Sequence, residues 1–118
     1  MKDIRTITEN ILLEIGANPG NKGFYHIVTA MEVIKEDIEC LNYATRLYIE
    51  IARRHETIPI RVERDIRHTK NNLLISGNLE NLEKYFPSIG MKFTNSEFLG
   101  TLYVRVNQKL REEENHAN

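Results

Sequence analysis

Arginine, histidine and asparagine residues recur between positions 61 and 72, and side chains of these types can read DNA bases. Arginine binds guanine through O6 and N7, asparagine binds adenine in a similar two-point manner, and glutamate accepts a hydrogen bond from cytosine. On a helix with about 100° per residue, one face would carry Arg61, Arg64, Asp65, His68, Asn71 and Asn72, with Glu63, Arg67 and Lys70 on its flanks. This pattern predicts a helix that reads a DNA major groove.

A solvated helix surface is the competing interpretation of the same residues. Glu63 and Arg67 form an i,i+4 pair, a common helix-stabilising contact worth only about 0.2–0.5 kcal/mol. Asp65 would repel DNA phosphates from the outward face. The pattern taken alone leaves both interpretations open.

The opposite face of this segment predicts how the helix is positioned, because it carries Val62, Ile66, Thr69 and Leu73. The helix is expected to begin near Ile58-Pro59, where proline is tolerated in a first turn, and to end by Gly77. A second helix is expected from about Tyr43 to His55, joined to it by a turn of about three residues. Two helices on so short a connection are typical of a helix-turn-helix, here about 43–77.

The remaining periodicity is also helical. Helices are expected from Ile4 to Ile15 with Gly16 as the stop, from about Gly23 to Leu41, and from Asn78 to Phe86. A last helix opens with Thr94 and Glu97 as a capping box and continues with an apolar stripe of Phe98, Leu102, Val106 and Leu110. A loop is expected from Pro87 to Phe93, and the acidic tail from about 112 to 118 is expected to fray. The chain is predicted to be one all-α, six-helix domain over residues 1–118.

Composition limits the function classes. The chain has 118 residues, a formal net charge of −1 and 41% hydrophobic residues, which suits a single folded domain. Six basic and three acidic residues lie between Arg53 and Lys70, so positive charge is concentrated there. The single cysteine, Cys40, is predicted to be a buried structural thiol, and one cysteine suits a reducing cytoplasm. No apolar run approaches a membrane span and no signal peptide opens the sequence, so a cytoplasmic location is expected.

Other chemistry finds little support in the sequence. The four histidines, His26, His55, His68 and His116, show no spacing typical of metal ligands, so no metal site is expected. Carboxylates such as Asp37 and Glu39 are interpreted as solvated, and no glycine-rich phosphate loop is present. The expectation is a protein without a cofactor that is not an enzyme.

Several strings, dispersed in order along nearly the whole chain, resemble one family. They are RVERDIRH (Arg61 to His68), IARRHET (Ile51 to Thr57), EIG (Glu14 to Gly16), Lys22-Gly23-Phe24, Asp37-Ile38-Glu39, Gly77-Asn78-Leu79-Glu80 and Thr94-Asn95-Ser96-Glu97-Phe98. The chain looks like the C-terminal effector domain of the stage-zero sporulation transcription factor A, the master response regulator of endospore formation.

The resemblance implies a function and a set of residues. It implies that the third and fourth helices form the helix-turn-helix, that the fourth lies in an operator major groove, and that the domain acts with RNA polymerase sigma factors. It assigns Glu63 and Arg64 to base edges, and Arg61, Arg67 and His68 to bases or phosphates; Asn71 joins them from the helical pattern. We expect two copies, a homodimer on adjacent half-sites of double-stranded DNA.

The chain also departs from the family pattern. Asp65 stands where a small residue is usual, and it would either repel phosphate or read a cytosine. Pro59 and Ile60 replace a small polar stretch, Thr69 to Asn72 replaces a more apolar one, and the loop before the last helix looks shorter. No receiver domain precedes Met1, so the chain is an excised domain or, as we favour, a stand-alone relative that aspartyl phosphorylation could not switch.

A second function remains open. A protein-interaction module that has lost DNA binding could titrate a sigma factor or a full-length sporulation regulator. Asp65 and the balanced net charge favour this alternative.

Overall fold

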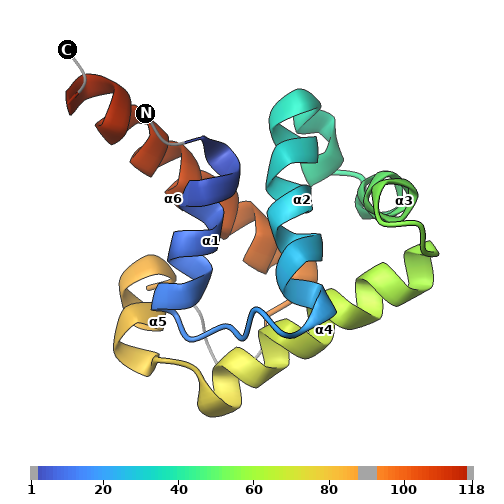
Figure 1. Ribbon diagram of the computed structural model, residues 1–118, viewed down its shortest axis with the longest axis horizontal. Helices are drawn as coiled ribbons and strands as arrows, with labels where there is room; N and C mark the ends of the chain where they lie inside the picture. The colour runs from blue at the N-terminus through green and yellow to red at the C-terminus, as the bar shows by residue number, and fades with distance from the viewer. Residues whose placement is uncertain (1–2, 88–92, 117–118) are drawn as a thin grey trace.

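The computed structural model describes residues 3–87 and 93–116, and in these ranges the chain is helical without strands. The helices are α1 (Ile4–Glu14), α2 (Lys22–Glu36), a short 3-10 helix η1 (Ile38–Leu41), α3 (Ala44–Arg54), α4 (Pro59–Ser76), α5 (Leu79–Tyr85) and α6 (Asn95–His116). The predicted single all-α domain is confirmed (Figure 1). Residues 88–92 of the expected loop, and with them its length, lie outside the described residues, as do residues 117–118 of the tail.

Helix ends follow the local signals in the sequence. Asp3 caps α1 by accepting a hydrogen bond from the Thr6 backbone N–H at 2.8 Å. Gly16 then ends the helix with a φ of 93°, a left-handed conformation that glycine adopts without strain. The predicted capping box of α6 is present, because Thr94 N–H donates to Glu97 Oε1 at 2.9 Å and Glu97 N–H donates to Thr94 Oγ1 at 3.0 Å.

Two predicted helix boundaries are wrong. The helix expected from about Gly23 to Leu41 breaks at Asp37, whose extended backbone (φ −145°) ends α2 and whose carboxylate accepts a hydrogen bond from Glu39 N–H at 3.2 Å. Helical spacing after Met31 and Ile34 places Ile38 on the apolar side of this helix, but the break leaves it 55% exposed. At the other end of the chain, α6 remains helical through His116, where we expected the tail to fray from about residue 112.

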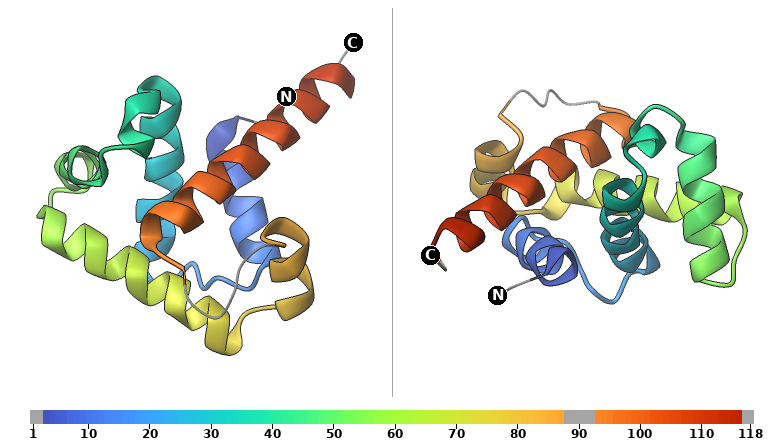
Figure 2. Two further views of the ribbon diagram at one scale, coloured as in Figure 1. Left: turned by 180° about the vertical axis from the view of Figure 1, so that it is seen from behind. Right: turned by 90° about the horizontal axis from the view of Figure 1, so that it is seen from above.

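The core lies where α1, α2, α4 and α6 meet. Helix α6 passes behind α1 and α2 in the view of Figure 1, and Figure 2 shows it from the other side. The largest fully buried side chains come from all four helices and include Ile11, Phe24, Ile34, Ile66 and Phe98. Helix α4 runs along one edge of this body and packs against α2 and α3. Among the described residues, no helix is long and apolar enough to cross a membrane.

Candidate DNA-binding interface

A tight turn over residues 55–58 joins α3 to α4. Glu56 has a φ of 53°, the left-handed conformation in which glycine is usual after a helix. The Thr57 backbone N–H reaches back to the carbonyl oxygen of Ala52 at 3.0 Å, the long hydrogen bond of a Schellman motif. Pro59 then occupies the first turn of α4. The predicted turn and both helices of the helix-turn-helix are therefore present, with boundaries within about a residue of those expected.

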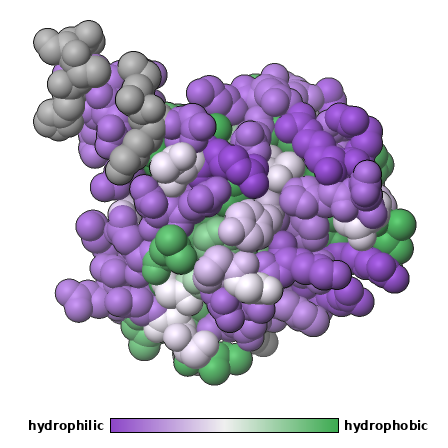
Figure 3. All heavy atoms as spheres, viewed as in Figure 1, coloured by the Kyte–Doolittle hydropathy of each residue, from purple (hydrophilic) through white to green (hydrophobic). Residues whose placement is uncertain are grey.

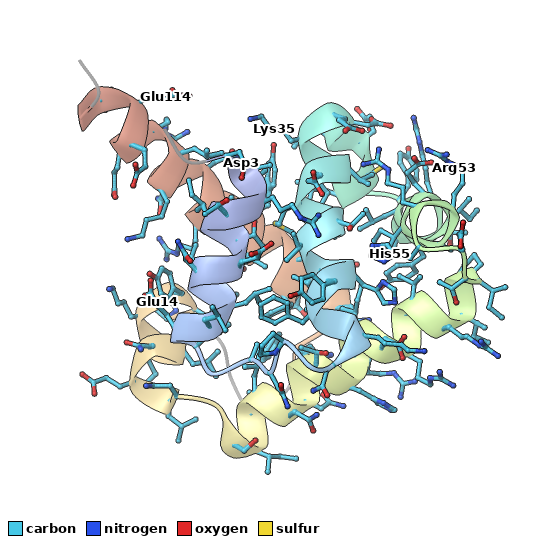
Figure 4. All side chains as sticks on the ribbon, viewed as in Figure 1. Asp3, Glu14, Lys35, Arg53, His55 and Glu114 are labelled. Atoms are coloured by element: carbon cyan, nitrogen blue, oxygen red, sulfur yellow. The ribbon has the colours of Figure 1, made fainter. Side chains whose placement is uncertain are left out.

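The helical phase predicted for α4 is confirmed on its inner face. Val62 and Ile66 are fully buried, and Thr69 and Leu73 are 2% and 1% exposed. Five of the six predicted site residues are exposed on the outer side of the helix: Arg61, Arg64, Arg67, His68 and Asn71. Side chains ending in nitrogen project from this edge of α4 in Figure 4, and the same edge is hydrophilic in Figure 3.

Glu63, the sixth predicted site residue, lies at the side of this face and is partly buried. Its carboxylate accepts two hydrogen bonds from Arg67, at 3.0 Å to Nε and 3.4 Å to Nη2, so the predicted i,i+4 pair is confirmed. Its backbone carbonyl accepts a hydrogen bond from Asn95 Nδ2 at 3.2 Å, which ties α4 to the start of α6. Two of the predicted site residues therefore form one unit on the α6 side of the face.

Asp65 does not lie on the outward face, and the expected outward placement of its carboxylate is wrong. Only 16% of its side chain is exposed, and its Oδ2 lies 3.3 Å from Nε2 of His26 on α2. Its Oδ1 lies 3.6 Å from Nη2 of Arg64. The reason is the close packing of α2 on this edge of α4: a Cβ on Gly23 would lie 2.1 Å from the Asp65 carbonyl oxygen.

Lys70 is the second correction on α4, because the structure buries it instead of exposing it on the flank. It is 6% exposed, and its ammonium donates a hydrogen bond to the Phe93 carbonyl oxygen at 2.7 Å. The ammonium also lies 5.5 Å from the centroid of the Phe93 ring. Burial lowers the pKa of Lys70, since desolvation disfavours the charged form.

The positive charge of the 53–70 segment is divided between a paired part and a free part. On α3, Arg53 and Arg54 both donate to Glu50, and Arg54 also pairs with Glu36. Hydrogen bonds from these two arginines lower the pKa of Glu50 to about 2. Arg61 forms no ion pair with any described residue, and the one ion pair of Arg64 within the described ranges is with Asp65, at 3.6 Å. Within this segment, the two arginines with the fewest carboxylate contacts, Arg61 and Arg64, therefore lie on α4.

A cleft of ≈ 430 Å³ separates the first turns of α2 and α4 and opens beside the exposed arginines. Lys22, His26, His55, Arg61, Arg64 and Asp65 contribute to its lining. His55, labelled in Figure 4, lies at the end of α3 and its Nε2 is 2.7 Å from Thr29 Oγ1 on α2. Its ring packs edge-on against His26, with centroids 4.6 Å apart. Burial lowers the pKa of both histidines.

Sequence reasoning missed Lys22 and His26 as neighbours of the site. His26 carried a weak signal, because the spacing of Gly23, His26 and Ala30 places it on one stripe of the predicted helix. That stripe includes the small residues that allow close helix contact. Lys22 appeared only within a family string and carried no signal of its own.

The structure also bears on the metal and thiol chemistry considered from the sequence. No group of three or more histidine, cysteine, aspartate or glutamate residues in the described part of the chain could hold a metal ion. Cys40 is buried, as predicted, and burial raises the pKa of its thiol.

These features define a class: an all-helical domain built around a helix-turn-helix whose second helix exposes an arginine-rich face. A family model described as Sporulation initiation factor Spo0A C terminal matches residues 8–106, which is most of the chain. The chain belongs to this family, and the resemblance seen in the sequence is confirmed. It is a DNA-binding domain of a sporulation regulator, and the family is one of transcription-factor domains, not of enzymes.

Proposed function

We propose that the domain regulates transcription by reading an operator major groove with α4, in the cytoplasm and together with an RNA polymerase sigma factor. The observation that carries this proposal is the outer face of α4, where Arg61, Arg64, Arg67, His68 and Asn71 are exposed along one side of a helix. Arginine and asparagine on such a face can contact base edges in two-point fashion. Two copies would occupy adjacent half-sites, so that each α4 enters one groove.

The packing of Asp65 supports this function over the interaction module. A free carboxylate on the reading face would repel the DNA backbone, which was the main argument for lost DNA binding. In the structure both oxygens of Asp65 have cationic or N–H neighbours and most of the side chain is covered. The outer face therefore presents mainly cations and amides to a partner.

A binding assay on DNA tests the proposal. Operator sequences are selected from a randomised library with the wild-type domain, and affinities for operator and random DNA are measured at two salt concentrations. Arg64→Ala should reduce discrimination by about 1–3 kcal/mol, the contribution of one two-point guanine contact. Arg111→Ala, which removes an exposed arginine of α6 away from α4, is the matched control and should keep full discrimination. A wild-type domain that selects no sequence would contradict the proposal.

A further inference from the structure

The carboxylate of Asp65 lies between a buried histidine and an exposed arginine. One oxygen, Oδ2, is 3.3 Å from Nε2 of His26, which is 5% exposed. The other oxygen, Oδ1, is 3.6 Å from Nη2 of Arg64, whose side chain is 51% exposed. Each oxygen therefore faces one partner, and the carboxylate connects the interior to the reading face.

His26, the buried partner of Asp65, is held in place by its neighbours. His26 packs edge-on against His55, and His55 is in turn held by Thr29 at 2.7 Å. An ionised carboxylate only accepts hydrogen bonds, so the tautomer of the neutral His26 ring that suits this contact carries its proton on Nε2, 3.3 Å from Asp65 Oδ2. The remaining ring nitrogen, Nδ1, is buried without a hydrogen-bond partner among the described residues. The ring cannot turn without breaking these contacts.

Arg64, the exposed partner of Asp65, is a candidate for contact with a DNA base. A guanidinium has five N–H donors in a rigid plane, so a single contact to Asp65 leaves the others free. An arginine on a helix surface otherwise samples many rotamers, and ordering such a side chain on binding opposes association. A carboxylate held on one side of the guanidinium restricts those rotamers before DNA arrives.

We propose that Asp65, held by His26, is a positioning residue that orients Arg64 for base recognition and so sharpens sequence specificity. The inference rests on the proposed function, because it presumes that α4 reads DNA. It assigns Asp65 a role different from contact with DNA: the carboxylate neither repels phosphate nor reads cytosine, since its oxygens already face His26 and Arg64.

The test measures base preference position by position with the same randomised operator library. Arg64→Ala first identifies the base pair that Arg64 reads. Asp65→Ala should weaken preference at that base pair by about 2- to 10-fold, the effect of freeing one long side chain, and leave the other positions unchanged. In the Arg64→Ala background, Asp65→Ala should have no further effect there. His26→Leu should relax the same base pair in the same direction.

Controls separate the possible outcomes. Asp65→Asn keeps the shape of the side chain and one oxygen, so it should fold even if Asp65→Ala is unstable. It should give an intermediate loss of base preference. Thermal unfolding of each variant checks that it is folded. If Asp65→Ala and Asp65→Asn both leave base preference at the Arg64 base pair unchanged, the positioning role is overturned while the proposed function stands. A uniform gain of affinity for all DNA would show phosphate repulsion, and a change at a different base pair would show direct reading; either result overturns it. A wild-type domain that selects no DNA overturns the proposed function with it.

Discussion

The two edges of the buried stripe on α4 each carry a charged residue, and the structure holds the two charges in different ways. On the edge that faces α2, Asp65 contacts two side chains, His26 and Arg64. On the edge that faces the start of α6, Lys70 donates to a backbone carbonyl, that of Phe93, at 2.7 Å. Both residues were expected at the exposed surface of the helix, and both are largely covered.

The two kinds of contact differ in how they respond to pH and to substitution. A backbone carbonyl does not titrate and survives any substitution of its own side chain, so the Lys70 contact fastens α4 to the segment before α6 under all conditions in which Lys70 is charged. The Asp65 contacts are made by an ionisable ring and a mobile guanidinium, so they respond to pH and to substitution at either partner. The Lys70 edge anchors α4 to the rest of the domain. The Asp65 edge links the buried His26 to Arg64 on the exposed face of α4.

Ile66 lies between the two edges, and replacing it should remove both at once. Ile66 is fully buried, and an aspartate there would place an unpaired charge in the core at a cost of several kcal/mol. We expect Ile66→Asp to unfold the domain, as measured by circular dichroism and thermal unfolding. Asn71→Asp adds the same charge at an exposed position of α4 and should remain folded. A cooperative unfolding transition in Ile66→Asp would show that the helical phase of α4 is wrong.

Removing the ammonium of Lys70 tests the anchoring edge alone. Lys70→Met keeps most of the side-chain volume but leaves the Phe93 carbonyl without its donor. We expect the free energy of unfolding to fall by about 1–3 kcal/mol, the effect of a buried acceptor left unpaired, in urea unfolding. Lys35→Met, at the exposed end of α2 (Figure 4), should change it by less than about 0.5 kcal/mol. Equal effects of the two substitutions would contradict the anchoring role.

Acidification should lower the free energy of unfolding through the two histidines, His26 and His55, on the Asp65 side of α4. The pKa of His26 is lowered by burial and by neighbouring His55, against the opposing charge of Asp65, and burial also lowers that of His55. The unfolded chain therefore binds protons near the ordinary value of 6.5, while the folded chain binds them only at lower pH. Because the unfolded state then holds more protons, the free energy of unfolding falls as pH decreases through 6.5.

Urea unfolding at pH 7.5 and at pH 5.5 measures this dependence. We expect the loss on acidification to be smaller than the effect of Lys70→Met. His26→Leu should reduce the loss, because one of the two rings no longer takes up a proton. An unchanged difference between the two pH values in that variant would assign the dependence to other groups.

A substitution in the turn that begins at His55 should have the smallest effect on the free energy of unfolding. This turn adjoins the Asp65 edge of α4. Glu56 adopts a φ of 53°, where a side chain is strained and glycine is not. Glu56→Gly should therefore raise the free energy of unfolding by about 0.5–1 kcal/mol. Glu56→Ala removes the charge but keeps the Cβ, so it should give no such gain in thermal unfolding. Equal gains in the two variants would point to the charge instead of the backbone.

Most of the fold was predictable because its determinants are local. Helical periodicity, Gly16 and the Thr94–Glu97 capping box place the helices, and the spacing of Val62, Ile66, Thr69 and Leu73 gives the correct inner face of α4. The break at Asp37 was missed because an unbroken apolar spacing outweighed a single capping residue. Exposure of the arginines followed from the same phase, while their roles toward DNA stay predictions.

The placement of Asp65 and Lys70 could not be predicted from the helix that carries them. Each lies at the border of the buried stripe, where the angle along the helix does not decide between solvent and interior. Their partners, His26 and Phe93, are distant in sequence, and only the packing of α2 and of the chain before α6 brings them close. Such tertiary contacts decide whether a charged residue at the border of the stripe is buried, so helical periodicity alone does not predict it.

The contact of α2 with α4 at Gly23 has a mechanical consequence. A Cβ at Gly23 would lie 2.1 Å from both the Asp65 carbonyl oxygen and Thr69 Oγ1, so the backbone of α2 packs directly on the Asp65 backbone and the Thr69 side chain of α4. Packed helices shift past each other by small sliding motions, and so close a contact leaves little room for them. We therefore expect α2 and α4 to move together. If α4 enters a major groove as proposed, we expect part of the fit to come from bending or twisting of the duplex, so that base pairs that no side chain touches influence affinity through their stiffness.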